Sequence, residues 1–407
     1  MATDSLRPLP IVASSVDPPS RDLDDRLDIR FLHPGYPSPL NVFLTLPRVD
    51  SESSDGAVVF GIHHQTALTA CQITAGNVFQ AGYFAADSAG GQKERVSLDG
   101  LLTKNSYYFI VDGNVKYPIV PSFKDWEFPH GQVPDLWPTI SHHGPIAVDI
   151  SVTCRMSGVS YAINRAHLVP QEESVWYLQN GMAVYGGDIN CKENILPLRK
   201  DLHKCFDDRW FAIVPKLTTG GTQYVSHILA RQASELWPTY QNLIIRGLTS
   251  ASKPYLFARF AWAVLLRVKP FVTQGFQRHV IRVHVDNNES SLVEYKEEIM
   301  TGIQLQAHYG GGGSKAATPL KRKTDARDEL GGLEDDSSEE EAETWDDLWD
   351  TGHEQGIPIR SAKRRQQTSS ESVPDDKPVL SSADRIALET SIGELVASQS
   401  EQGSMEE

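Results

Sequence analysis

The chain has 407 residues and a formal net charge of −15 at pH 7, a length that suggests two domains and an additional segment. The excess of acid is local, because residues 310–407 carry 11 basic and 23 acidic residues, whereas residues 1–309 carry 27 and 30. The nearly neutral part does not exclude a polyanionic substrate. The four cysteines form no CxxC pair, which excludes a disulfide scaffold and a four-cysteine zinc site.

Neither a secretory signal nor a membrane span is expected. The N-terminal sequence MATDSLRPLP has no apolar run of the kind that signal peptides contain. The most apolar stretch, residues 255–272, includes Arg259, Arg267 and Lys269, and charges at the centre of a span are costly. We therefore expect a soluble intracellular protein with no membrane partner.

The N-terminal third predicts a mostly-β unit after a disordered arm. Residues 1–25 are rich in Pro, Ser and Asp and show no periodicity, which is typical of disorder. Residues 26–139 contain short runs of β-branched and aromatic residues separated by turn formers, namely DIRFLH, NVFLTL, AVVFGI, SYYFIVD and YPIVP. Residues 65–75 predict one helix. The sequence assigns this unit no function.

Residues 140–305 predict a second domain in which strands and helices are mixed. Strands are expected at IAVDISVTC (146–154), RWFAIVP (209–215) and RHVIRVHV (278–285). Helices are expected at 200–208, at 222–237 and at 254–268, where apolar residues recur at helical spacing. The whole chain is thus expected to have an α+β fold.

Residues 306–407 predict a disordered acidic tail. GGGGSK, which begins the tail, lacks the spacing of a phosphate-binding loop and is typical of a linker. The basic clusters at 321–323 and 363–365 are either nuclear import signals or solvated patches, so a nuclear location stays open. An acidic stretch around Trp345 and Trp349 favours either a protein-binding segment or a solubilising tail.

The residues that carry chemistry lie between Cys154 and Lys216. His167 ends a short apolar run, and Asn194 opens the next one. His203 and Asp207 are four residues apart in a predicted helix, so they share one face and suit one divalent ion. Phosphodiester hydrolysis needs a base for water, positive charge at the phosphate and fixed positions for both. These residue types cover those needs, with histidine as the base and asparagine as its support.

The stretch resembles the HNH endonuclease family with its ββα-metal fold. It is similar to fungal HNH-domain proteins that read CxxSG or CxxTG, then AHLVP, then NxxxLRxDLHxxFD, and the core of the resemblance is residues 154–216. The resemblance implies that His167 is the general base and that Asn194 supports its loop. It also implies that His203 ligates one divalent ion (Mg, Mn or Zn), with Asp207 where some members have a second helix ligand.

One position departs from the family pattern. Many active members carry Asp or His as a metal ligand immediately before the base, where this chain has Ala166. The loss weakens the expected metal site or removes it, unless the carboxylate of Asp207 compensates. The alternative function is therefore a non-catalytic HNH-fold protein that acts as an interaction module through its acidic, tryptophan-containing tail.

Basic residues predict a nucleic-acid substrate. Lys192, Arg199, Lys200 and Lys204 flank Asn194 and His203, and residues 236–285 hold seven basic residues and no acidic one. Such residues bind phosphate backbones, although they could instead pair with acidic residues of the same domain. We expect a metal-dependent HNH-type endonuclease that cuts nucleic acid, DNA in the first place, with low sequence specificity.

Overall fold

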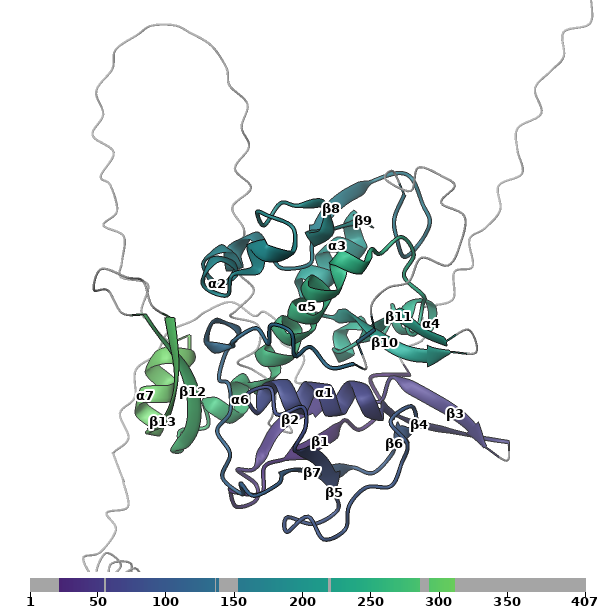
Figure 1. The fold of residues 1–407 in the computed structure, drawn as a ribbon. Helices are drawn as coiled ribbons and strands as arrows, with labels where there is room; N and C mark the ends of the chain where they lie inside the picture. Colours follow the sequence, from purple (N-terminus) through teal and green to yellow (C-terminus); the bar gives the residue numbers. More distant parts are fainter. Residues whose placement is uncertain are drawn as a thin grey trace, which may run out of the picture. The chain divides into compact units, whose positions relative to one another are not determined.

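The computed structural model describes residues 22–54, 56–135, 137–138, 153–218, 221–285 and 293–311. All of them belong to one compact unit, Met1–Glu334, and they form a mixed α+β fold with several small sheets (Figure 1). None of the helices in these ranges is long and apolar enough to cross a membrane. Most of the expected arm, the strand at 146–154 and the acidic tail lie outside the described residues.

The N-terminal region is built mostly of strands, as predicted. One sheet has the order β2-β1-β7-β5, in which β1 and β7 are parallel and the other pairs antiparallel; a second has the order β3-β4-β6. The elements are β1 (Ile29–Leu32), β2 (Val42–Leu46), β3 (Asp50–Ser54), β4 (Ala57–His63), α1 (His64–Thr74), β5 (Gly82–Ala85), β6 (Leu101–Leu102) and β7 (Ser106–Val111). The single helix expected at 65–75 is confirmed as α1.

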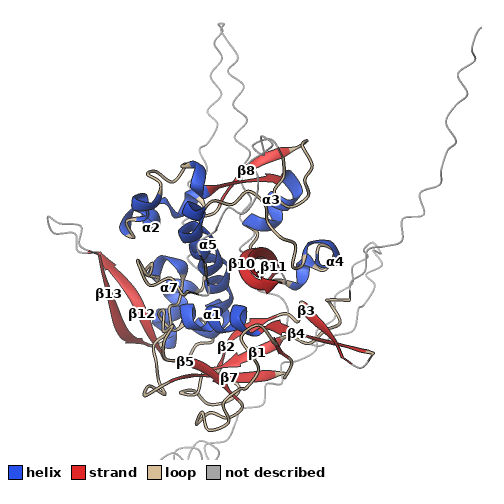
Figure 2. Cartoon of the chain, turned by 45° about the vertical axis from the view of Figure 1, so that its right-hand side comes forward, coloured by secondary structure: helices blue, strands red, loops and turns tan. Residues whose placement is uncertain are grey.

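Helix α1 lies along the four-stranded sheet (Figure 2) and is buried on all sides from His64 to Thr74. Its polar side chains therefore need partners inside the protein. Gln72 Nε2 donates to the carbonyl oxygen of Phe79 at 3.1 Å, and Thr74 Oγ1 donates to that of Ala70 at 2.9 Å.

The remaining elements follow in the second half of the described chain. They are β8 (Ile163–His167), α2 (Ser174–Gln179), β9 (Ile195–Arg199), α3 (Lys200–Asp207), β10 (Phe211–Thr218), β11 (Gly221–Ile228), α4 (Trp237–Tyr240), α5 (Lys253–Leu265), α6 (Lys269–Val272), β12 (Arg278–Val285), β13 (Val293–Met300) and α7 (Gly302–Tyr309). The predicted helices at 200–208 and 254–268 and the strands at 209–215 and 278–285 are confirmed. Ordered structure extends past the boundaries expected at both ends, since Leu23 is buried and α7 reaches Tyr309.

The helix expected at 222–237 is wrong: the structure has a strand, then a 3-10 turn at Arg231–Ala233, and only its last residue, Trp237, lies in an α-helix, α4. Residues Gly221–Ile228 form strand β11, which pairs antiparallel with β10 along its full length. Val225 and Ile228 have the spacing of a helix face, but a short apolar run does not separate helix from strand by periodicity alone. The neighbouring strand β10 supplies backbone partners, which decide the outcome.

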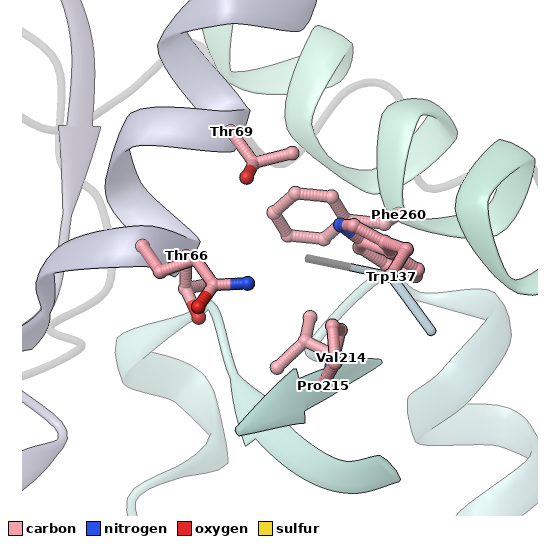
Figure 3. Close-up of a pocket in the computed structure, with 7 residues that line it drawn as sticks. Thr66, Thr69, Trp137, Val214, Pro215 and Phe260 are labelled. Atoms are coloured by element: carbon pink, nitrogen blue, oxygen red, sulfur yellow. The ribbon is translucent and has the colours of Figure 1, made fainter. Parts of the chain in front are cut away.

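Helix α5 is the central element of this half. It packs against α1 and β10 and runs from α1 toward the β8–β9 hairpin (Figures 1 and 2). Every residue from Tyr255 to Leu265 is buried. Figure 3 shows the narrow gap where these elements meet: Thr66 and Thr69 of α1 face Trp137, Val214, Pro215 and Phe260.

A buried ion pair fastens the N-terminal sheets to the second half. Lys216 Nζ on β10 lies 2.7 Å from Asp50 Oδ1 on β3, with side chains only 10% and 5% exposed. Asp50 also accepts from the main chain of His63 and from the side chains of Gln241 and Asn242. Burial alone would raise the pKa of Asp50, but the charges of Lys216 and His227 and the hydrogen bonds from Lys216 and Asn242 together outweigh it and hold that pKa well below its usual range.

Replacement of Lys216 by methionine should destabilise the fold by about 3–5 kcal/mol, because it leaves the Asp50 carboxylate buried without its counter-charge. The measurement is urea unfolding followed by circular dichroism. Lys296→Met is the control, since Lys296 pairs with Glu294 at the surface and should cost less than about 1 kcal/mol. Equal losses in the two variants would contradict the role given to Asp50 and Lys216.

Candidate active site

The β8–β9 hairpin presents one face to the core and the other outward. The strands pair antiparallel from Ile163 opposite Arg199 to His167 opposite Ile195, and side chains alternate between the faces. Ala166 lies on the inner face and is fully buried, whereas Arg165 and His167 lie on the outer face. His167 therefore stands at the end of a strand and on its outer side.

Asn194 fastens the chain that leaves β8 to the chain that enters β9. Its side chain is fully buried. Oδ1 accepts from the amide of Val169 at 2.7 Å, and Nδ2 donates to the carbonyl oxygens of Val169 and Ile189 at 3.1 and 2.7 Å. All three bonds go to main-chain groups, as expected for a residue that supports the loop.

The ring of His167 is held by a residue that the sequence did not single out. Its Nε2 lies 3.1 Å from Oδ1 of Asn190, which also accepts from Gln171 Nε2 at 2.7 Å. Because an amide oxygen only accepts, this contact places the hydrogen of a neutral His167 on Nε2 and the lone pair on Nδ1. Asn190 belongs to no recognisable sequence motif, so its contact with His167 became apparent only in the structure.

His203 and Asp207 lie together on α3, as their spacing predicts. His203 Nε2 is 3.1 Å from Asp207 Oδ2, and the side chains are 21% and 48% exposed. Burial raises the pKa of Asp207, but the hydrogen bond from His203 and the charge of Arg259 outweigh it, so the pKa lies below its usual value. The carboxylate is therefore ionised at neutral pH.

Arg259 of α5 joins the two elements that carry these residues. Its side chain is fully buried, and Nη2 lies 3.5 Å from Asp207 Oδ1 and donates to the carbonyl oxygen of Phe206 at the end of α3. Nη1 lies 3.4 Å from the carbonyl oxygen of His167 at the end of β8. The guanidinium also stacks on the rings of Phe206 and Trp262. One buried cation thus connects the end of β8 to the end of α3.

The four basic residues expected to bind phosphate differ in their surroundings. Arg199 makes two bonds to Asp201, at 2.6 and 2.7 Å, and Lys204 lies 2.7 Å from Asp208. Lys192 is 90% exposed and 3.7 Å from Glu193. Lys200 is exposed, and no ion pair holds it within the described ranges. Lys192 and Lys200 are the more available pair.

Four of the seven basic residues in the segment 236–285 are not free to form the phosphate surface that its charge suggested. Arg259 and Arg278 are buried, Arg267 donates to main-chain carbonyls, and Arg282 pairs with Glu298. These arginines serve the interior and its edges. By contrast, the exposed Arg165 shares the outer hairpin face with His167 and has no ion pair among the described residues.

The donor set suits a weakly held divalent ion. No three His, Cys, Asp or Glu side chains in the described part of the chain cluster so as to hold a metal. The residues that would hold an ion are His203 and Asp207, whose Nε2 and Oδ2 atoms lie 3.1 Å apart and are hydrogen-bonded to each other. Ala166 adds no donor and faces the core. Water and substrate oxygens would fill the remaining positions, as is common for Mg²⁺.

A comparison with known proteins finds a family match over the segment that contains these residues. Residues 154–214 match the model of a family described as HNH endonuclease, and the matched range includes β8, β9 and α3 with His167, Asn194, His203 and Asp207. The match supports an HNH endonuclease domain at these residues, and with it phosphodiester hydrolysis in nucleic acid. No curated protein and no solved structure matches the chain.

Replacement of Asn194 by alanine should destabilise the fold by about 3 kcal/mol, because it leaves buried main-chain groups without partners. The amide of Val169 should also lose protection in hydrogen exchange, since Asn194 is its acceptor. Asn164→Ala on β8 is the control and should cost less than about 1 kcal/mol. Unchanged protection of Val169 in Asn194→Ala would count against the anchoring role.

Proposed function

We propose that this chain is a metal-dependent endonuclease that hydrolyses phosphodiester bonds of DNA with low sequence specificity. The observation that carries the proposal is the junction at Arg259, where a strand end with His167 meets a helix end with His203 and Asp207. These residues lie in the segment that matches the HNH endonuclease family. They supply a base and a cation site within one small region.

His167 acts as the general base. The bond between Nε2 and Asn190 Oδ1 fixes the ring and leaves Nδ1 to take a proton from water. General base catalysis by a positioned side chain contributes about 10²–10⁴-fold to a rate. Asn194 keeps the loop that follows His167 in place through its bonds to Val169.

His203 and Asp207 hold the divalent ion, which is Mg, Mn or Zn. When bound, such an ion supplies positive charge to the scissile phosphate and to the leaving oxygen. His203 must offer the lone pair of Nε2 to a cation, so its own proton then sits on Nδ1. The ionised Asp207 supplies the negative charge of the site.

The outer face of the hairpin binds the nucleic-acid backbone. Arg165, Lys192 and Lys200 are exposed and offer their charge to phosphates. Arg199 and Lys204 are also candidates, but each must exchange an aspartate for a phosphate. Because phosphate contacts carry no direct sequence information, low specificity follows.

A second candidate function is a non-catalytic HNH-fold interaction protein. The observation that favours it is Ala166, whose buried methyl group stands where many HNH enzymes have a metal ligand. In that case His203 and Asp207 would pair only with each other and with Arg259. The acidic tail that would bind the partner lies outside the described residues.

The two functions predict different results in a plasmid-nicking assay with the full-length chain. The endonuclease should nick supercoiled plasmid with at least one of Mg²⁺, Mn²⁺ and Zn²⁺, and a chelator should stop it. His167→Ala should lower the rate by about 10²-fold or more, since it removes the base, and His203→Ala should abolish the metal-dependent nicking.

The matched control for nicking is His284→Ala, a partly exposed histidine on β12 that pairs with Glu298. It should nick at the rate of the unaltered chain. Absence of nicking with every ion, in a chain that unfolds cooperatively, would reject the endonuclease and favour the interaction protein.

Arg165 and Arg199 lie on the same hairpin face and allow a paired test of DNA binding. Arg165→Gln should weaken binding to a short duplex and reduce the salt dependence of the affinity by about one phosphate contact. Arg199→Gln should do less, because Asp201 already engages its guanidinium. Fluorescence anisotropy over a series of salt concentrations measures the affinity and its salt dependence for both variants. An equal or larger loss in Arg199→Gln would contradict the role given to Arg165.

A further inference from the structure

Arg259 is an unusual residue for its position. It is the one charged side chain between Tyr255 and Leu265, a stretch of α5 with no exposed residue. An arginine guanidinium keeps its charge in proteins, so α5 holds a buried cation at this position. Among the described residues, Asp207 is the one carboxylate within 4.0 Å of it. Its other partners are main-chain carbonyls and aromatic rings.

The two oxygens of Asp207 consequently have different partners. Oδ1 faces the guanidinium of Arg259, and Oδ2 faces Nε2 of His203. A cation bound at His203 and Asp207 can therefore use only one oxygen of the carboxylate, Oδ2. The positive charge of Arg259 lies on the other side of the same carboxylate and repels the cation. Like charges at such distances repel strongly where solvent does not screen them.

We propose that Arg259 is a positioning residue that orients Asp207 and keeps cation binding at the His203–Asp207 pair weak until a phosphate group arrives. The proposal rests on the proposed endonuclease function. The negative charge of the phosphate offsets the guanidinium and adds oxygen ligands, so nucleic acid and cation bind cooperatively. The site then holds its ion mainly when substrate is present.

Two substitutions separate the charge of Arg259 from its geometry. Arg259→Gln removes the charge but retains an amide that can donate to the carbonyls of Phe206 or His167. Arg259→Lys keeps the charge but loses the planar fork that bridges α3 and β8. A purely structural role would make both variants bind a cation less well, whereas the proposed role makes them differ.

The experiment measures Mn²⁺ affinity of the full-length chain by titration calorimetry, with nicking rates recorded beside it. Arg259→Gln should bind Mn²⁺ about tenfold more tightly than the unaltered chain, because a repelling charge is gone, yet nick more slowly. Arg259→Lys should bind Mn²⁺ within about threefold of the unaltered chain and also nick more slowly. Unchanged or weaker Mn²⁺ binding in Arg259→Gln would overturn the proposal.

Arg267→Gln is the matched control. Arg267 follows on the same helical segment and donates to the carbonyls of Leu229 and Arg209. No contact with Asp207 is seen for it in the described part of the chain. This variant should lose stability without tighter Mn²⁺ binding, and tighter binding there would also overturn the proposal.

A second measurement needs no variant and covers the case in which Arg259→Gln does not fold. Mn²⁺ affinity of the unaltered chain should rise about tenfold or more when a short DNA duplex is added at low temperature, and equal affinity with and without duplex would overturn the proposal. A chain that never nicks but shows these Mn²⁺ effects would lose the endonuclease function alone. If the chain nicks DNA but shows none of these effects on Mn²⁺ affinity, only the role proposed for Arg259 is rejected.

Discussion

A charged side chain on a helix with no exposed side must find its partners within the protein. The partners of Arg259 determine much of the arrangement of the site. Its guanidinium needs a carboxylate and several carbonyl oxygens, and the ends of α3 and β8 supply them. Meeting that need brings the strand end with His167 to the helix end with Asp207. The central helix α5 thus sets the distance between the candidate base and the candidate cation pair.

The site also depends on amide side chains that do no chemistry. The side-chain oxygen and nitrogen of Asn194 bond to main-chain groups of Val169 and Ile189. Asn190 sets which ring nitrogen of His167 carries the proton. Both lie in the segment that leads into β9, after α2. Such polar supports give a weakly liganded site the fixed geometry that hydrolysis requires.

The sequence predicted the parts of the site that reside in local spacing. His203 and Asp207 share a face because a helix repeats every 3.6 residues, and α3 and α5 were recognisable from their apolar spacing. Contacts between distant segments were not predictable: Arg259 reaches Asp207 from another helix, and Asn190 reaches His167 from 23 residues further along the chain. The helix predicted at 222–237 was wrong because a short apolar run fits a helix and a strand equally well, and the pairing of β11 with β10 is a contact between segments that the spacing does not show.

The ion pair between Asp50 and Lys216 affects whether the HNH segment can fold outside this chain. The segment that matches the family ends at residue 214, but the next strand residues carry a buried ammonium whose counter-charge lies on β3, more than a hundred residues earlier. One hydrophobic cluster also includes residues from both halves of the described chain. The HNH segment therefore does not carry all the contacts that it needs to fold. Expressed without the rest of the chain, it would lose the counter-charge and the apolar contacts that other segments provide.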